Sequence, residues 1–93
     1  MASLHPDHGA RVVLEREAVE GEVARYRVQI YEPAAVTYGT HVTLSAEAVE
    51  TATWEREPPP WIGVFVERLL KTFAKSHAGG PWPRKVTRWR EER

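Results

Sequence analysis

Hydrophobic residues recur with a period of two through the first half of this chain and with a helical period in one later segment. The clearest alternation lies in residues 22–31, where Ala24, Tyr26, Val28 and Ile30 share one face. Successive strand residues point to opposite faces of a sheet, so this pattern predicts a strand with one face toward a core and one toward water. Burial on one face only is typical of antiparallel sheets.

A second alternating segment precedes this strand. Val12 and Leu14 lie two positions apart and predict a strand of their own. Residues 18–21 are expected to form the turn between the two strands, because Gly21 can adopt a positive φ. Opposite charges are then expected to face each other across the hairpin: Glu15 and Glu17 on one strand, Arg25 and Arg27 on the other.

Two further strands are predicted after Pro33, which ends the second strand because proline cannot donate a hydrogen bond to a ladder. Residues 40–45 resume the alternation, with Val42 and Leu44 on the inner face. Residues 51–56 contain two threonines and a tryptophan, residue types that are enriched in strands. This composition predicts a fourth strand.

One amphipathic helix is predicted over about residues 59–77. It begins within the prolines of 58–60, which a first helical turn tolerates because the missing N–H would have no partner there. The apolar residues that follow the i, i+3, i+4, i+7 spacing are Trp61, Ile62, Phe65, Val66, Leu69, Leu70 and Phe73. Gly79 and Gly80 are expected to end the helix.

These elements predict an α+β fold, in which a four- or five-stranded, mainly antiparallel meander sheet carries one amphipathic helix across one face. Residues 1–9 are expected to form a flexible N-terminal tail, and residues 10–93 a single domain. Residues 84–90 form either a last strand at the sheet edge or a basic tail. The predicted core consists of Val12, Leu14, Tyr26, Val28, Ile30, Val42, Leu44, Trp54, Ile62, Phe65, Val66, Leu69 and Phe73.

The composition excludes several kinds of chemistry and of cellular location. The 93 residues include no cysteine, which excludes disulfides, thiolate metal ligands and cysteine nucleophiles. The first residues have neither the basic nor the apolar region of a secretory signal, and no apolar run approaches the roughly 20 residues of a membrane span. We therefore expect a cytoplasmic protein that does not enter a membrane.

The net charge of zero hides an asymmetry along the chain. Residues 1–60 carry five basic and ten acidic side chains, whereas residues 61–93 carry eight basic and three acidic ones. Such a split marks either a basic binding surface or two halves that pack together and complement each other's charge.

No motif for catalysis or for cofactor binding is present. The serines lie outside any Gly-x-Ser-x-Gly turn, and the glycines at 79–80 lack the pattern of a phosphate-binding loop. His5 and His8 have a His-x-x-His spacing, but Pro6 and the expected tail oppose a preformed metal site. The sequence therefore predicts a non-enzymatic protein without a cofactor, a metal or catalytic residues.

The most distinctive chemistry lies in the last third of the chain, where tryptophans are interleaved with cations. Basic side chains neutralise phosphates and aromatic rings stack on bases, so this mixture suits single-stranded nucleic acid. Trp82 beside Pro83 also suits the edge of a small core. The candidate partner-binding residues are Lys71, Lys75, Trp82, Arg84, Lys85, Arg88, Trp89 and Arg90.

For function, we expect a small binding module that contacts another protein or, as a homodimer, a second copy of itself. Tryptophan and arginine are favoured at protein interfaces, and four tryptophans exceed what a core of this size easily hides. An open edge strand could pair with a strand of the partner. Binding of single-stranded nucleic acid through the basic last third is the alternative.

Overall fold

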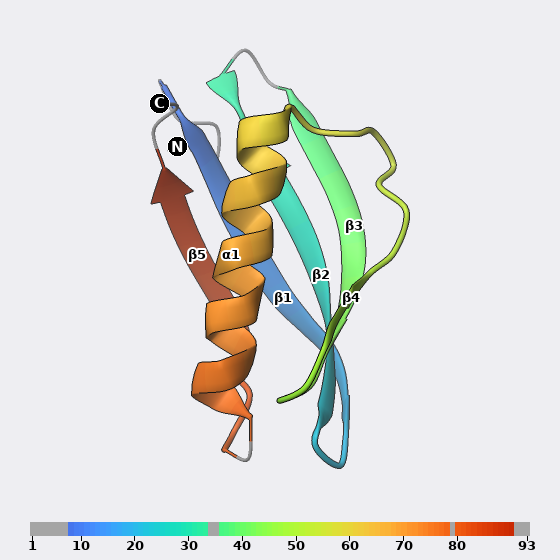
Figure 1. The fold of residues 1–93 in the computed structure, drawn as a ribbon. Helices are drawn as coiled ribbons and strands as arrows, with labels where there is room; N and C mark the ends of the chain where they lie inside the picture. The colour runs from blue at the N-terminus through green and yellow to red at the C-terminus, as the bar shows by residue number, and fades with distance from the viewer. Residues whose placement is uncertain (1–7, 34–35, 79, 91–93) are drawn as a thin grey trace.

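A computed structural model describes the fold of residues 8–33, 36–78 and 80–90. In chain order its elements are β1 (Ala10–Glu20), β2 (Val23–Tyr31), β3 (Thr37–Leu44), β4 (Val49–Thr51), α1 (Pro60–His77) and β5 (Lys85–Arg90). The predicted α+β class is confirmed (Figure 1). The tail expected over 1–9 lies outside the described residues, apart from His8 and Gly9.

The five strands form one antiparallel sheet with the order β4-β3-β2-β1-β5. The first four strands make the predicted meander. After α1 the chain returns to the opposite edge, where β5 pairs with β1, so residues 85–90 form a strand and not a tail (Figure 1). The helix α1 lies across one face of the sheet and is not long and apolar enough to span a membrane.

The hairpin between β1 and β2 is longer than the sequence predicts. β1 continues to Glu20, so the turn consists of Gly21 and Glu22 and does not begin at Ala18. Gly21 has the expected positive φ of 61°. The sequence located the turn correctly but not its length, because pairing with β2 keeps residues 18–20 in the strand.

A β-bulge interrupts β1 at Glu17. Glu15 lies opposite Arg27 as predicted, but Ala18 and not Glu17 lies opposite Arg25. The additional residue shifts the register and leaves Glu17 without a cross-strand partner in the ladder. The expected Glu17–Arg25 pair is therefore wrong, and Glu17 contacts a different residue, described below.

The fourth strand lies earlier than predicted, at Val49–Thr51 and not at 51–56. The segment after β4 still follows β3, because the backbone N–H of Glu55 donates to the carbonyl of Gly39 at 3.0 Å. The Glu55 carboxylate lies over Gly39, within 2.6 Å of where a Cβ atom would be. Single backbone hydrogen bonds to β3, and not a continuous ladder, thus hold this segment beside the sheet, which periodicity does not reveal.

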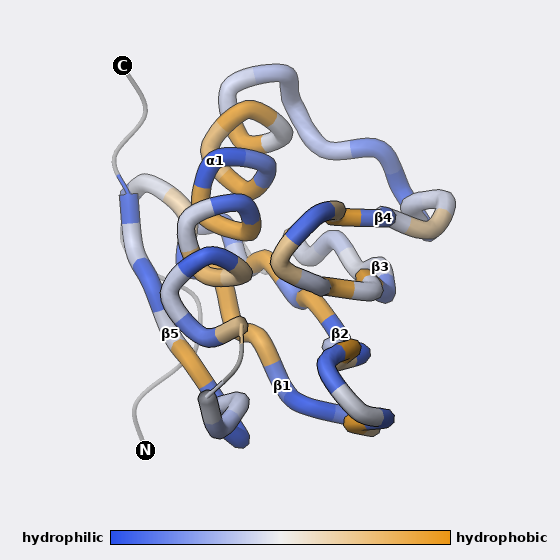
Figure 2. The backbone as a smooth tube through the Cα atoms, turned by 60° about the horizontal axis from the view of Figure 1, so that its bottom comes forward, coloured by the Kyte–Doolittle hydropathy of each residue, from blue (hydrophilic) through white to orange (hydrophobic). Residues whose placement is uncertain are grey.

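The core lies between α1 and the sheet face that α1 covers. In Figure 2, β1 is hydrophobic where it passes under α1 and hydrophilic toward the β1–β2 turn. Three predicted core residues, Trp54, Phe65 and Leu69, are only partly buried at its margin. Core residues that the prediction omitted are Ala10, Ala24, Tyr38, Leu70, Ala74 and Trp82.

The Tyr26 side chain links the sheet to the segment before β5. Its ring is fully buried and makes an edge contact with Phe73, with 5.2 Å between ring centroids. Its hydroxyl donates a hydrogen bond to the carbonyl of Pro83. Burial raises the pKa of the Tyr26 phenol above its ordinary value of 10.0, and the nearby Arg16 opposes this shift more weakly.

This raised pKa predicts how stability depends on pH. The contribution of the Tyr26 phenol to the free energy of unfolding should be constant below about pH 10. It should fall above that pH, because the unfolded chain releases the phenol proton first. In Tyr26→Phe the fall should be shallower, though not absent, since burial also raises the pKa of Tyr38. Urea unfolding between about pH 8 and about pH 11 measures both slopes. Identical slopes would show that Tyr26 does not retain its proton in the folded protein.

Candidate functional site

The helix α1 carries two adjacent apolar stripes, and the sheet covers only one of them. The first stripe is buried against the sheet and consists of Ile62, Val66, Leu70, Phe73 and Ala74. The second stripe consists of Trp61, Phe65 and Leu69, four residues apart, and is partly buried. The second stripe faces a groove that Arg90 of β5 also lines.

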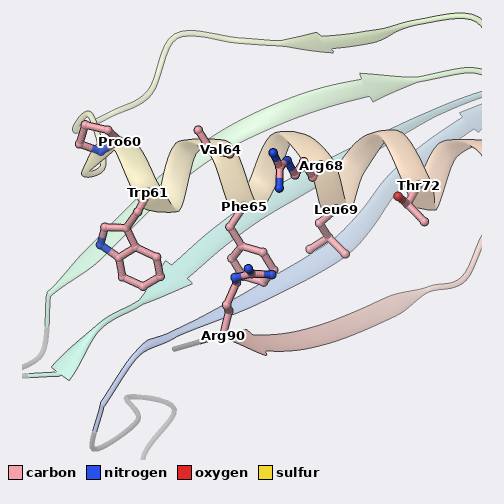
Figure 3. A pocket seen from close by; sticks show the side chains of 8 residues that line it. All are labelled: Pro60, Trp61, Val64, Phe65, Arg68, Leu69, Thr72 and Arg90. Carbon is pink, nitrogen blue, oxygen red and sulfur yellow. The ribbon is translucent and has the colours of Figure 1, made fainter. Parts of the chain in front are cut away.

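A groove of about 580 Å³ runs along this second stripe. Figure 3 shows Trp61, Phe65 and Leu69 projecting from α1 toward β5, and Arg90 reaching up from β5. Val64, which also lines the groove, is 50% exposed. The groove therefore presents aromatic and aliphatic surface to the outside of the molecule.

The sequence of β5 explains why this groove stays open. Val86, Arg88 and Arg90 lie opposite Leu14, Val12 and Ala10, so they are on the helix side of the sheet. Two of these three positions carry an arginine where a covered strand would carry an apolar residue. The Arg90 guanidinium lies 5.6 Å from the centre of the Phe65 ring, a cation–π contact that leaves the rest of the stripe uncovered.

Of the two tryptophans that the sequence singled out, one is buried and the other is exposed. Trp82 is 5% exposed and packs beside Tyr26 and Phe73 in the core, so its ring is not available to a partner. Trp89 is 46% exposed on the other face of the sheet from α1. Its indole N–H donates to the carbonyl of His8 at 2.9 Å, and the His8 ring meets it edge-on.

The predicted basic residues do not form one surface. Arg88 and Arg90 face the helix side of β5, whereas Lys85 lies on the other face, opposite Glu15. Lys71 and Lys75 line a different hollow, between α1 and residues 45–49. Lys71 also forms an ion pair with Glu67 one turn before it, at 2.9 Å. Arg68, a helix cation that was not among the candidate partner-binding residues, lines the groove instead.

The two halves of the chain share one sheet, but their charges meet at few points. Lys85 and Glu15 lie opposite each other across β5 and β1, and Arg27 follows on β2. This row alternates in sign, as two complementary halves would require. On the helix side, Arg88 and Arg90 form no ion pair with any carboxylate of the described residues.

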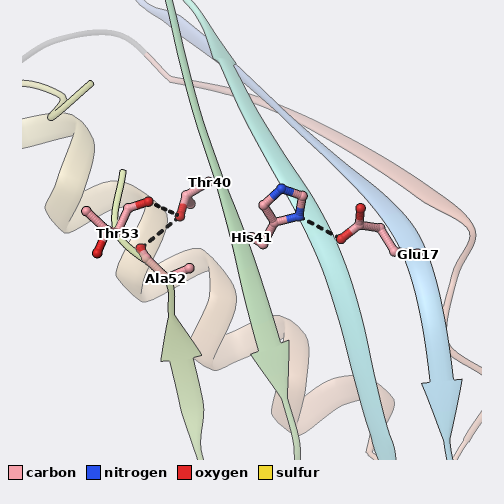
Figure 4. Close-up of polar contacts among 5 residues, drawn as sticks. All are labelled: Glu17, Thr40, His41, Ala52 and Thr53. Carbon is pink, nitrogen blue, oxygen red and sulfur yellow. Dashed lines mark hydrogen bonds and ion pairs between the residues drawn. The ribbon is translucent and has the colours of Figure 1, made fainter. Parts of the chain in front are cut away.

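A histidine–carboxylate contact lies on the sheet face away from α1. His41 Nδ1 is 2.7 Å from Glu17 Oε1, and both side chains are largely exposed (Figure 4). The bulge in β1 frees Glu17 to reach across β2, so the distance along the sequence concealed this pair. On the other face of β3, the buried Thr40 hydroxyl donates to the Ala52 carbonyl at 2.8 Å (Figure 4).

The histidine–carboxylate contact is exposed, and it is an ion pair only when His41 is protonated. Pairs of this kind contribute at most about 1 kcal/mol to stability. Among the residues that the structure describes, no three histidine or carboxylate side chains gather as metal ligands. His77 packs against the Phe73 ring at the end of α1, and His5 lies outside the described part of the chain.

Fold and groove together define a small α+β domain with a half-covered helix beside an edge strand. The chain matches no known protein family, no curated protein and no solved structure at a significant level.

Proposed function

We propose that this protein is a small, non-enzymatic interaction module that binds another protein, or a second copy of itself, in the groove between α1 and β5. The observation that carries the proposal is the second apolar stripe of α1. Trp61, Phe65 and Leu69 are only partly covered, and Val64 is half exposed beside them. Aromatic side chains flanked by arginine are the residues that most often carry the binding energy of protein interfaces. The cytoplasmic location expected from the sequence is part of this proposal.

Single-stranded nucleic acid is the second candidate, favoured by the concentration of cations in β5 and directly before it. Arg84, Lys85, Arg88 and Arg90 lie within seven residues. Three observations favour a protein partner instead. Trp82 is buried, the Trp89 N–H is already bonded to His8, and the lysines of α1 lie on its other flank. The tryptophans and cations that the sequence singled out are therefore not gathered on one surface.

Selection from a displayed library of random peptides tests the proposal. We expect peptides that bind the wild-type protein and bind Val64→Gln about tenfold more weakly, because burying the exposed half of a valine side chain is worth roughly 1 kcal/mol or somewhat more. Lys75→Gln is the matched control: it changes an exposed residue on the other flank of α1 and should leave binding unchanged. Analytical ultracentrifugation of the same variants shows whether the wild-type protein also binds itself through the groove.

Two results would contradict the proposal. The first is that neither peptides nor a second copy bind in a manner sensitive to Val64→Gln. The second is fluorescence-anisotropy binding of single-stranded DNA or RNA that falls by a decade or more between about 50 and about 200 mM salt and is lost in Arg88→Glu. That behaviour would identify β5 as a phosphate-binding surface.

A further inference from the structure

The outer edge of β5 has no neighbouring strand among the described residues, although the Thr87 carbonyl accepts a hydrogen bond from the Arg88 guanidinium at 2.9 Å. A strand that pairs at this edge would replace that side-chain contact. The backbone N–H of Arg16 donates to the carbonyl of Arg84 at 2.9 Å, which fixes the phase of hydrogen bonding between β1 and the β5 segment. Because hydrogen-bonded and non-bonded pairs alternate along antiparallel neighbours, every second residue of β5 directs its backbone groups away from β1. These outward residues are Lys85, Thr87 and Trp89. β5 is the last strand of the sheet, so no strand of the described residues lies beyond it.

The charge around this edge is mainly positive, although Glu15 lies opposite Lys85 and the sequence continues with Glu91 and Glu92 after Arg90. Between Glu67 and Glu91 the sequence contains seven lysines and arginines and no acidic residue. Within β5 the cations lie toward the two ends, with Val86 and Thr87 between them. The groove above the strand adds Arg68. An occupant that brought carboxylates to both ends of β5 would meet cations at each end, and within the described part of the chain Arg84, Arg88 and Arg90 form no ion pair.

The same charges disfavour a second copy of β5 as the occupant. Antiparallel pairing of two β5 strands about Thr87 would bring Arg84 of one copy beside Arg90 of the other, at both ends. Like charges directly across a ladder are destabilising. The other edge strand, β4, offers only Val49–Thr51 for pairing. A segment of another protein with the opposite charge fits the edge better than either strand of this chain.

We propose that the partner is an acidic, extended segment that adds to the sheet as a strand beside β5. Its backbone pairs with the outward N–H and C=O groups of Lys85, Thr87 and Trp89. Its central apolar side chains on the helix side enter the groove, and carboxylates at its two ends meet the cations of β5. This inference rests on the proposed function and specifies its partner. Strand addition of this kind takes affinity from the backbone and specificity from alternate side chains.

A designed peptide tests the partner's chemistry. The probe is a labelled peptide of about nine residues, with valine and threonine alternating in the centre and two glutamates at each end. We expect saturable binding that weakens as salt rises. The same peptide with glutamine in place of glutamate should bind at least about tenfold more weakly. Equal binding of the two peptides, or binding of neither, would overturn the inference.

A proline substitution tests the mode of binding. Thr87→Pro removes an outward N–H but none of the hydrogen bonds to β1, so an edge strand should tolerate it. We expect the probe to bind Thr87→Pro at least about tenfold more weakly, and Thr87→Ser, which keeps the N–H, to bind as the wild type does. Hydrogen exchange in the wild-type protein supplies a readout that needs no variant. The amides of Lys85, Thr87 and Trp89 should exchange more slowly when the probe is bound.

The outcomes separate this inference from the proposed function. If the peptides selected from the library are apolar without acidic residues, or bind as helices without protecting the β5 amides, the acidic strand is wrong while the groove remains a protein-binding site. The same holds if ultracentrifugation shows a second copy in the groove. If no peptide responds to Val64→Gln and no second copy binds there, both proposals fail together.

Discussion

Trp82→Ala is expected to lower the free energy of unfolding by about 3–5 kcal/mol, the usual cost of removing a large aromatic side chain from a core. Trp82 is 5% exposed, and its ring centroid lies 6.3 Å from that of Tyr26 and 6.0 Å from that of Phe73. The truncation would leave a cavity beneath the C-terminal end of α1. Urea unfolding followed by far-ultraviolet circular dichroism measures the change.

Trp89→Ala is the matched control, because it removes the same side chain from an exposed position of β5. It should change the free energy of unfolding by less than about 1 kcal/mol, since Trp89 is 46% exposed. If Trp82→Ala does not fold, Trp82→Phe keeps an aromatic ring in the core and should give a smaller loss of the same sign. Similar effects of Trp82→Ala and Trp89→Ala would contradict the burial of Trp82.

Leu70→Ala is expected to destabilise the protein by about 2–5 kcal/mol, because it creates a cavity in a packed core. Leu70 is 1% exposed and lies in the stripe of α1 that packs on the sheet. The measurement is again urea unfolding, with the slope of the transition expected to stay constant.

Leu69→Ala changes the neighbouring residue and serves as the control for Leu70→Ala. Leu69 belongs to the second stripe and faces the groove, so its truncation should cost less than about 2 kcal/mol. It should, however, weaken binding of the peptide probe. If Leu69→Ala proved as destabilising as Leu70→Ala, the second stripe would belong to the core and the groove would not be an open site.

Leu69 and Leu70 also show that the sequence does not predict which apolar residues of the helix the sheet buries. The helical spacing identifies both residues as apolar and places them on one broad face. It does not say how wide a face the sheet can cover. That depends on where α1 crosses the sheet and on which strand lies beneath each stripe. The predicted core accordingly included Leu69 and omitted Leu70, and the structure reverses the two.

The tryptophans illustrate the same limit for the candidate site. Both tryptophans belong to the last third of the chain, where Trp82 lies between two prolines and Trp89 between two arginines. One enters the core because the segment before β5 passes the end of α1, where Tyr26 and Phe73 receive it. The other is exposed because it falls on the outer face of an edge strand. The prolines beside Trp82 and the arginines beside Trp89 agree with these environments, but they do not say which elements receive the Trp82 ring.

The sequence by itself determined the elements of this protein, because strand and helix periods are local properties of the chain. The alternation in 22–31 corresponds to β2, and the helical spacing to α1 at Pro60–His77. Only the tertiary structure decided the length of the first hairpin, the shift of β4, and the meeting of Glu17 with His41. It also decided that β5 pairs with β1. That pairing places Arg88 and Arg90 beneath the second stripe of α1 and leaves the groove open. The sequence does not reveal the pairing, because it joins residues about 75 positions apart through backbone hydrogen bonds, which leave no signature in the side-chain pattern.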